Sequence, residues 1–202
     1  MKTALFAAAA CAALTIAAPA LAGEVFAGLY KHDVTFIGEA VGLGAAGRED
    51  GVDLHLGYRT DRVEKLTWLG RPQVHAFVSI NSENTSNFVA TGFSWPLDIG
   101  AEGGFYVRPG IGLAYTDGEA GLPPANVGGL TPEELARRTK LYYTRIDFGS
   151  QLLFEPELAL GYRFNDTWSG ELSYTHLSNG QIFAQGKNQG LDDVGLRLVY
   201  AF

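Results

Sequence analysis

The chain has 202 residues and a formal net charge of −7 at pH 7, and hydrophobic residues make up 47% of it. This length suits one domain, and the acidic balance excludes nucleic acid as the expected partner, because binding to phosphates requires a basic surface. Aromatic residues (12%) occur together with 26 glycines, a combination that favours β-structure over a charged helical domain.

The first residues have the pattern of a secretory signal peptide. Lys2 precedes an apolar run that ends with the triplet Ala-Leu-Ala, so we expect residues 1–22 to be removed and the mature chain to begin at Gly23. A membrane anchor fits less well, because small residues dominate the run. Cys11 lies inside the run instead of after it, which argues against a lipoprotein. Without this segment the chain has no cysteine and therefore no disulfide.

Short segments of alternating apolar and polar residues follow along the rest of the chain. In the second of them Val52, Leu54 and Leu56 share one face, while Asp53 and His55 share the other. A period of two over eight or more residues is the signature of a β-strand. No stretch of about 18 apolar residues interrupts this pattern, so no transmembrane helix is expected. The eight predicted strands are 23–30, 51–59, 73–81, 86–95, 104–115, 152–164, 168–180 and 194–202.

Three features of these strands favour a membrane barrel over a soluble β-sandwich, which would also show alternation. The apolar faces are long and almost wholly lipophilic, and the opposite faces combine charged residues and histidines with glycines. Aromatic residues gather near the strand ends, where interfacial girdles form. The terminal Phe202 is similar to the C-terminal signal of bacterial outer-membrane proteins. We therefore predict an all-β, eight-stranded antiparallel transmembrane β-barrel over residues 23–202. The predicted girdle residues are Tyr58, Trp95, Tyr115, Tyr162, Trp168 and Tyr200.

The connections fit this topology in part. With both termini in the periplasm, the connections after the first, third, fifth and seventh strands face the cell exterior. The segments 96–103 and 165–167 are short, as periplasmic turns should be, whereas 60–73 is longer than this rule predicts. The largest connection, 116–146, lies outside.

The segment TPEELARR within the largest connection predicts a short helix. Thr131 is the expected N-cap, Pro132 takes the first helical position and Glu134 closes a capping box. The following Arg137, Arg138 and Lys140 form either a solvated face or a contact with anionic lipid head groups.

The seventh strand ends in a pattern that indicates chemistry. His176 and Ser178 share its lipid-facing side at the outer end, with Cα atoms about 6.6 Å apart. A serine becomes nucleophilic when a base takes its proton, and a carboxylate orients that base. Counting back from Phe202 places Asp192 on the same face of the next strand and Asp193 in the lumen. A pairing of 176 with 192 also puts 178 opposite 190. The alternative is that these polar residues merely mark the head-group boundary.

At these residues the chain resembles the lipid A 3-O-deacylase family of outer-membrane enzymes. Residues 176–180 (HLSNG) are similar to the family's His-x-Ser-Asn motif, and residues 188–192 (NQGLD) are similar to its Asn-x-Gly-x-Glu motif. The chain departs from the family in two ways: Asp192 replaces the family's glutamate, and the loop between the motifs is about two residues longer. Either departure could be compensated by the strand register, or it could signal an altered or lost activity.

The resemblance implies roles for five residues. Ser178 would be the nucleophile, His176 the general base and Asp192 the orienting acid, while Asn179 and Gly180 would support the oxyanion. The implied reaction is hydrolysis of an ester-linked 3-hydroxyacyl chain of lipid A, most simply at position 3, with the lipopolysaccharide substrate in the outer leaflet beside the barrel wall.

No metal or organic cofactor is implied by the resemblance. Some family members form dimers, so a homodimer is possible, and the sequence leaves this open. The competing hypothesis is a non-enzymatic small barrel in the outer membrane, which would be a structural protein, an adhesin or a narrow pore.

Overall fold

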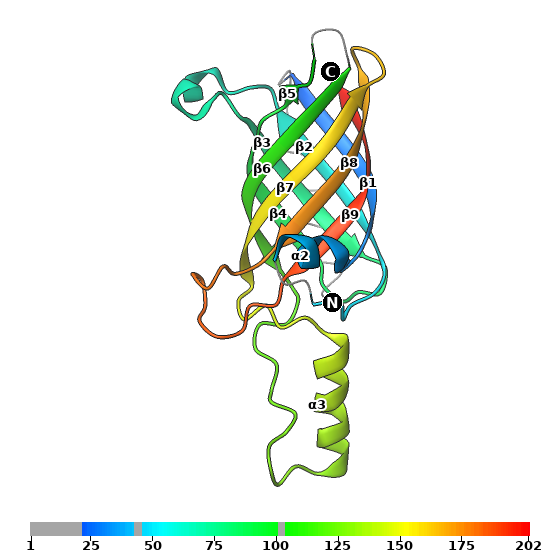
Figure 1. The fold of residues 1–202 in the computed structure, drawn as a ribbon, viewed down its shortest axis with the longest axis vertical. Coiled ribbons are helices and arrows are strands. Elements are labelled where there is room, and N and C mark those ends of the chain that lie inside the picture. Colours follow the sequence, from blue (N-terminus) through cyan, green and yellow to red (C-terminus); the bar gives the residue numbers. More distant parts are fainter. Residues whose placement is uncertain (1–21, 43–45, 101–103) are drawn as a thin grey trace.

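The computed structural model describes residues 22–42, 46–100 and 104–202, so the predicted signal peptide lies outside the described residues except for its last position. The described chain forms a β-barrel with a helix-bearing extension at one end (Figure 1). Its long strands are β1 (Gly23–Lys31), β2 (Val52–Thr60), β3 (Gln73–Asn81), β4 (Phe88–Ser94), β6 (Phe105–Thr116), β7 (Leu152–Arg163), β8 (Trp168–Leu177) and β9 (Leu191–Ala201).

Each long strand pairs antiparallel with the next one along the chain, and β1 also pairs with β9, which closes the barrel. In the closing register Val25 lies opposite Tyr200. The short β5 (Leu97–Asp98) pairs with β6 beyond the end of β4 and does not count as a separate strand of the barrel wall. The predicted eight-stranded antiparallel barrel is confirmed.

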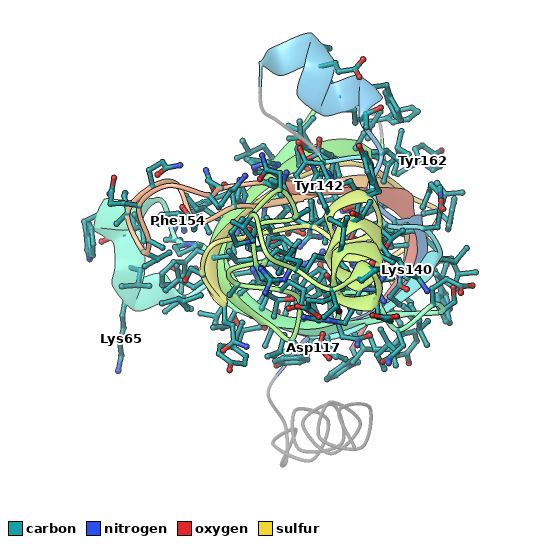
Figure 2. All side chains as sticks on the ribbon, turned by 90° about the horizontal axis from the view of Figure 1, so that it is seen from below. Lys65, Asp117, Lys140, Tyr142, Phe154 and Tyr162 are labelled. Carbon is teal, nitrogen blue, oxygen red and sulfur yellow. The ribbon has the colours of Figure 1, made fainter. Side chains whose placement is uncertain are left out.

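The two faces of the wall differ as the strand alternation predicts. On β9, Leu196 is 69% exposed toward the bilayer, whereas the adjacent Arg197 is 2% exposed and points into the lumen. The lumen is filled with side chains when the molecule is viewed from its helix-bearing end (Figure 2). A closed sheet satisfies its backbone groups by hydrogen bonds between strands, so the apolar face can contact lipid.

Paired charges lie inside the lumen, most of them in the half near the chain ends. Arg59 lies 3.3 Å from Glu171, Arg108 lies 3.0 Å from Glu171, and Arg197 lies 2.9 Å from Glu157. Each buried charge has an opposite partner, without which burial of the charge would cost several kcal/mol.

Aromatic rings also need space inside the barrel. A side chain on the inward-facing Gly57 would overlap the Phe26 ring and the Phe77 Cβ atom. At this position the small residue lets two large rings share the lumen.

The rim that carries the chain ends has an aromatic girdle. Gly23 and Phe202 exchange two backbone hydrogen bonds there, at 3.2 and 3.0 Å. On the lipid side the ring centres of Trp168 and Tyr200 are 4.9 Å apart. This rim therefore has the features of the periplasmic membrane interface. The 3₁₀ helix η1 (Glu64–Leu69) occupies the connection at this rim that is longer than the rule for periplasmic turns predicts.

The opposite rim carries the longer connections and two helices, α2 (Phe36–Val41) and α3 (Pro132–Thr144). The predicted cap of α3 is confirmed, because the Thr131 hydroxyl accepts a hydrogen bond from the Glu134 N–H at 3.2 Å. The helix projects away from the barrel (Figure 1). Arg137 and Arg138 both bind the Glu134 carboxylate, which favours the solvated face. None of the described helices is long and apolar enough to cross a membrane.

Candidate active site

The register of the last two strands brings His176 directly opposite Asp192, as the count from Phe202 predicts. The His176 Nδ1 atom lies 2.5 Å from Asp192 Oδ1. His176 is 4% exposed and Asp192 is fully buried. An imidazole held through Nδ1 by a carboxylate keeps its Nε2 atom for a second partner, the arrangement of a general base.

Tyr174 is a third member of this hydrogen-bond group that sequence reasoning did not identify. Its hydroxyl donates to the same Oδ1 atom of Asp192 at 3.0 Å. The signal was available, because Tyr174 lies two positions before His176 and therefore on the same face of β8. The Asp192 Oδ1 atom thus interacts with two groups, which fixes the direction in which the carboxylate points.

The loop after β1 continues along the β9 edge of this site. The Val34 N–H donates to the Asp192 carbonyl at 2.8 Å, and the Ala46 N–H donates to the Gly190 carbonyl at 3.0 Å. Between these two contacts the chain forms α2, which lies on the outside of the barrel wall (Figures 1 and 2). The sequence pattern did not predict this helix or its position on the lipid side of the barrel.

Ser178 follows β8 and is held through its backbone by the preceding strand. Its N–H donates to the Phe154 carbonyl at 3.2 Å, and the Phe154 N–H donates to the Ser178 carbonyl at 2.7 Å. The ladder between β8 and β9 ends at the pair Leu177 and Leu191, so the predicted pairing of 178 with 190 is wrong. At Ser178 the chain no longer pairs with β9, but it keeps the register of its pairing with β7.

The Ser178 side chain is half-buried, and within the described chain its hydroxyl makes no hydrogen bond to His176. The structure thus joins His176 and Asp192 directly, while Ser178 follows two residues later with its hydroxyl uncommitted. Hydrogen bonds between catalytic groups are commonly long before substrate binds and tighten in the complex.

Asn179 holds together the loops that surround the serine. Its amide group donates to the carbonyls of Phe148 (2.6 Å) and Lys187 (2.8 Å), and its Oδ1 atom accepts from the Gln181 N–H at 2.7 Å. Its own N–H donates to Asn188 Oδ1 at 2.7 Å. The two sequence motifs are therefore connected by a direct hydrogen bond, and both amide hydrogens of Asn179 already have acceptors.

Gly180 takes a backbone conformation that suits glycine. Its φ angle is +61°, and a Cβ atom would stand 3.0 Å from the Phe154 ring. Among the described residues its N–H has no hydrogen-bond acceptor. The Gly180 N–H is thus a backbone donor two positions after Ser178 that a substrate oxygen could use.

The model of the lipid A 3-O-deacylase (PagL) family matches residues 50–201, which are three quarters of the chain. This range includes the five candidate site residues His176, Ser178, Asn179, Gly180 and Asp192. The chain belongs to the PagL family. It is an outer-membrane β-barrel of a Gram-negative bacterium, and the family is one of hydrolases that modify lipopolysaccharide.

Solved structures are similar to the chain in fold. The crystal structure of the outer-membrane enzyme PagL has a TM-score of 0.53 and 14% identity, covering 87% of this chain and 97% of that one. The N-terminal β-barrel domain of Pseudomonas aeruginosa OprF has a TM-score of 0.46 and 11% identity, covering 89% and 99% of the two chains. Neisserial surface protein A has a TM-score of 0.47 and 12% identity, covering 90% and 96%. None of the curated proteins is similar enough in sequence to match.

Proposed function

We propose that the protein is a serine esterase that removes an ester-linked 3-hydroxyacyl chain from lipid A, at position 3. The observation that carries this proposal is the hydrogen bond of 2.5 Å between His176 and Asp192, on the lipid-facing wall and two residues before Ser178 in a chain of the PagL family. A general base and its orienting acid on the lipid-facing wall, at the outer rim, would be next to an ester bond of a lipid in the outer leaflet.

The side chains divide the reaction into steps. The Ser178 Oγ atom attacks the ester carbonyl carbon while His176 Nε2 takes its proton, and Asp192 stabilises the imidazolium through Nδ1. The Gly180 N–H donates to the oxyanion that forms on the carbonyl oxygen. The tetrahedral intermediate then expels the sugar oxygen, which receives the proton from His176. Water, activated by the same base, releases the 3-hydroxy fatty acid and restores the serine.

The position of Asp192 supports an active site despite the replacement of the family's glutamate. The side chain is one methylene shorter, yet it reaches the imidazole because His176 is its direct cross-strand partner. Residues that face each other directly across an antiparallel pair have Cβ atoms about 5 Å apart, a gap that an aspartate and a histidine can bridge.

The wall on the membrane side of the site can receive an acyl chain. A shallow, largely apolar hollow of about 920 Å³ extends over β1, β8 and β9, between Leu172, Leu196 and Leu198. Leu172 lies on the same face as His176, four residues and about 13 Å along the strand toward the membrane interior. An acyl chain attached at the head group would run along this hollow toward the membrane centre.

The paired charges that cross the lumen disfavour the narrow pore among the non-enzymatic alternatives. Arg59, Arg108 and Arg197 are each at most 2% exposed inside the barrel. A structural barrel or an adhesin would need no catalytic group on the outer wall, so chemistry on lipid A separates these hypotheses. The possible homodimer stays a prediction.

The test is the mass of lipid A from cells that produce the protein or its variants. We expect the wild type to remove the mass of one 3-hydroxyacyl chain and Ser178→Ala to leave lipid A unchanged. The matched control is Ser173→Ala, on the same strand but buried in the lumen, which should act like the wild type. The altered migration of folded barrels in unheated electrophoresis samples verifies folding. A folded wild type that leaves lipid A intact, or a Ser178→Ala variant that still deacylates, would overturn the proposal.

A further inference from the structure

A second group of imidazoles and carboxylates lies inside the barrel, on the other face of β9 from the candidate active site. The His32 Nδ1 atom is 2.9 Å from Asp53 Oδ2 and 3.5 Å from Asp193 Oδ1. Its Nε2 atom is 3.1 Å from Glu49 Oε2. All of these side chains are buried. The proposed esterase reaction uses none of them.

His55 adds an unpartnered imidazole to this group. The residue is fully buried, and within the described chain neither of its ring nitrogens has a hydrogen-bond partner. Its Nε2 atom lies 3.7 Å from Asp193 Oδ2, which also has no hydrogen-bond partner among the described residues. Leaving a buried polar group unsatisfied costs about 1–3 kcal/mol. Two such atoms that face each other indicate that a further species belongs between them.

We propose that this group is a zinc site in which His32 Nδ1, Asp53 and Asp193 are the protein ligands and a water is the fourth, with His55 beside Asp193. Tetrahedral zinc binds nitrogen and oxygen at about 2.0–2.2 Å, which places neighbouring ligand atoms roughly 3.3 Å apart. His32 Nδ1 lies 2.9 Å from Asp53 Oδ2 and 3.5 Å from Asp193 Oδ1, and these two separations bracket this value. The ligand atoms of His32, Asp53 and Asp193 all lie within 4.8 Å of one another.

The surrounding groups already hold the proposed ligands in place. Glu49 accepts from His32 at the ring nitrogen that faces away from the ion, the carboxylate–histidine arrangement common around zinc. Asn81 donates to Asp53 Oδ1 at 2.7 Å, and Ser79 donates to Asp53 Oδ2 at 3.0 Å. An imidazole nitrogen among the ligands favours zinc over calcium or magnesium, which prefer oxygen ligands throughout.

A proton on His32 is the competitor of the ion. Zinc would take the place of a proton on Nδ1, while the Nε2–H group would still donate to Glu49, so binding at Nδ1 releases a proton to solvent.

The proposed ion would connect distant parts of the chain at the outer rim. His32 follows β1, Asp53 and His55 belong to β2, and Asp193 belongs to β9. Asp193 is the chain neighbour of Asp192, so an ion in the lumen would hold the backbone from which the proposed catalytic acid extends. The zinc site itself does not depend on the esterase proposal.

The test measures zinc bound to the full-length barrel in detergent. Metal-free protein is refolded with excess Zn²⁺, freed of unbound ion by gel filtration, and analysed by mass spectrometry for the metal. We expect one zinc per chain in the wild type and none in His32→Gln or Asp193→Asn. The matched control is His75→Gln, which removes a buried lumen histidine that binds Glu155 elsewhere in the barrel, and it should retain zinc. No zinc in the wild type, or equal zinc in folded Asp193→Asn, would refute the site.

A second measurement decides the question if the ligand variants do not fold. Co²⁺ replaces zinc in the wild-type protein, and its visible absorption distinguishes four-coordinate from six-coordinate sites. We expect the intense absorption of a tetrahedral ion with nitrogen and oxygen ligands, together with displacement of Co²⁺ by Zn²⁺. A weak six-coordinate spectrum would refute the tetrahedral site, and the absence of bound Co²⁺ would mean that the cluster holds no ion.

Discussion

Two adjacent carboxylates of β9 have opposite surroundings. Asp192 faces the outer wall and binds one imidazole and one phenol, whereas Asp193 faces the lumen beside two histidines and a second aspartate. One step along a strand reverses the face, so neighbours in sequence can belong to separate sites. In this barrel the outer face is where a lipid substrate could react, and the inner face holds charged groups that are linked to one another.

The largest expected effect on the deacylation rate comes from replacing each of these two carboxylates in turn by an amide. Asp192→Asn should reduce kcat for lipid A deacylation by about 10,000-fold, because the amide stabilises neither the correct tautomer nor the imidazolium. Folded Asp193→Asn should remain within a few-fold of the wild type. Rates on detergent-solubilised lipopolysaccharide measure both. The reverse order would place catalysis on the lumen side.

An intermediate effect is expected from the residue that holds the loops of the outer face. Asn179→Ala removes hydrogen bonds to Phe148, Lys187 and Gln181 and leaves buried backbone groups without partners. The free energy of unfolding should fall by about 1–3 kcal/mol, as measured by urea titration of the barrel in detergent. Asn126→Ala, at an exposed loop position, is the control and should leave the unfolding midpoint unchanged. Equal midpoints for both variants would mean that Asn179 does not hold these loops.

The smallest effect concerns the phenol that shares the Asp192 oxygen. Tyr174→Phe removes one hydrogen bond worth about 1 kcal/mol, so kcat should fall roughly five- to tenfold with little change in KM. Tyr200→Phe changes a girdle residue of the same lipid-facing surface and should leave kcat unaltered. If the two variants behave alike, the hydroxyl of Tyr174 contributes nothing to orienting the acid.

Strand periodicity was enough to predict the barrel, the lumen and the register of His176 with Asp192. This worked because a closed antiparallel sheet fixes the direction of each side chain by parity alone. The same count failed at Ser178, where the pairing with β9 has ended although the pairing with β7 continues. Parity describes a ladder and does not show where the ladder ends.

The features that sequence reasoning missed depend on contacts between distant segments. Helix α2 is only six residues long, too short for an apolar period to stand out. The α3 prediction stopped after Arg138, although no helix-breaking residue occurs before Thr144, where the helix ends. His32, Glu49, Asp53 and Asp193 come together only through strand pairing across the β1 closure, so no local spacing could have indicated a metal site.

The hydrogen bond between Asn179 and Asn188 makes the positions of the candidate catalytic residues independent of the length of the loop between the two motifs. Together with the link from Asn179 to Lys187, it closes the segment 180–187 at its base, so additional residues extend into solvent and leave the strand ends unmoved. The two extra residues noted in this loop can thus be accommodated without cost to the site. An epitope inserted after Ala184 should consequently be displayed on the cell surface by a barrel that still folds.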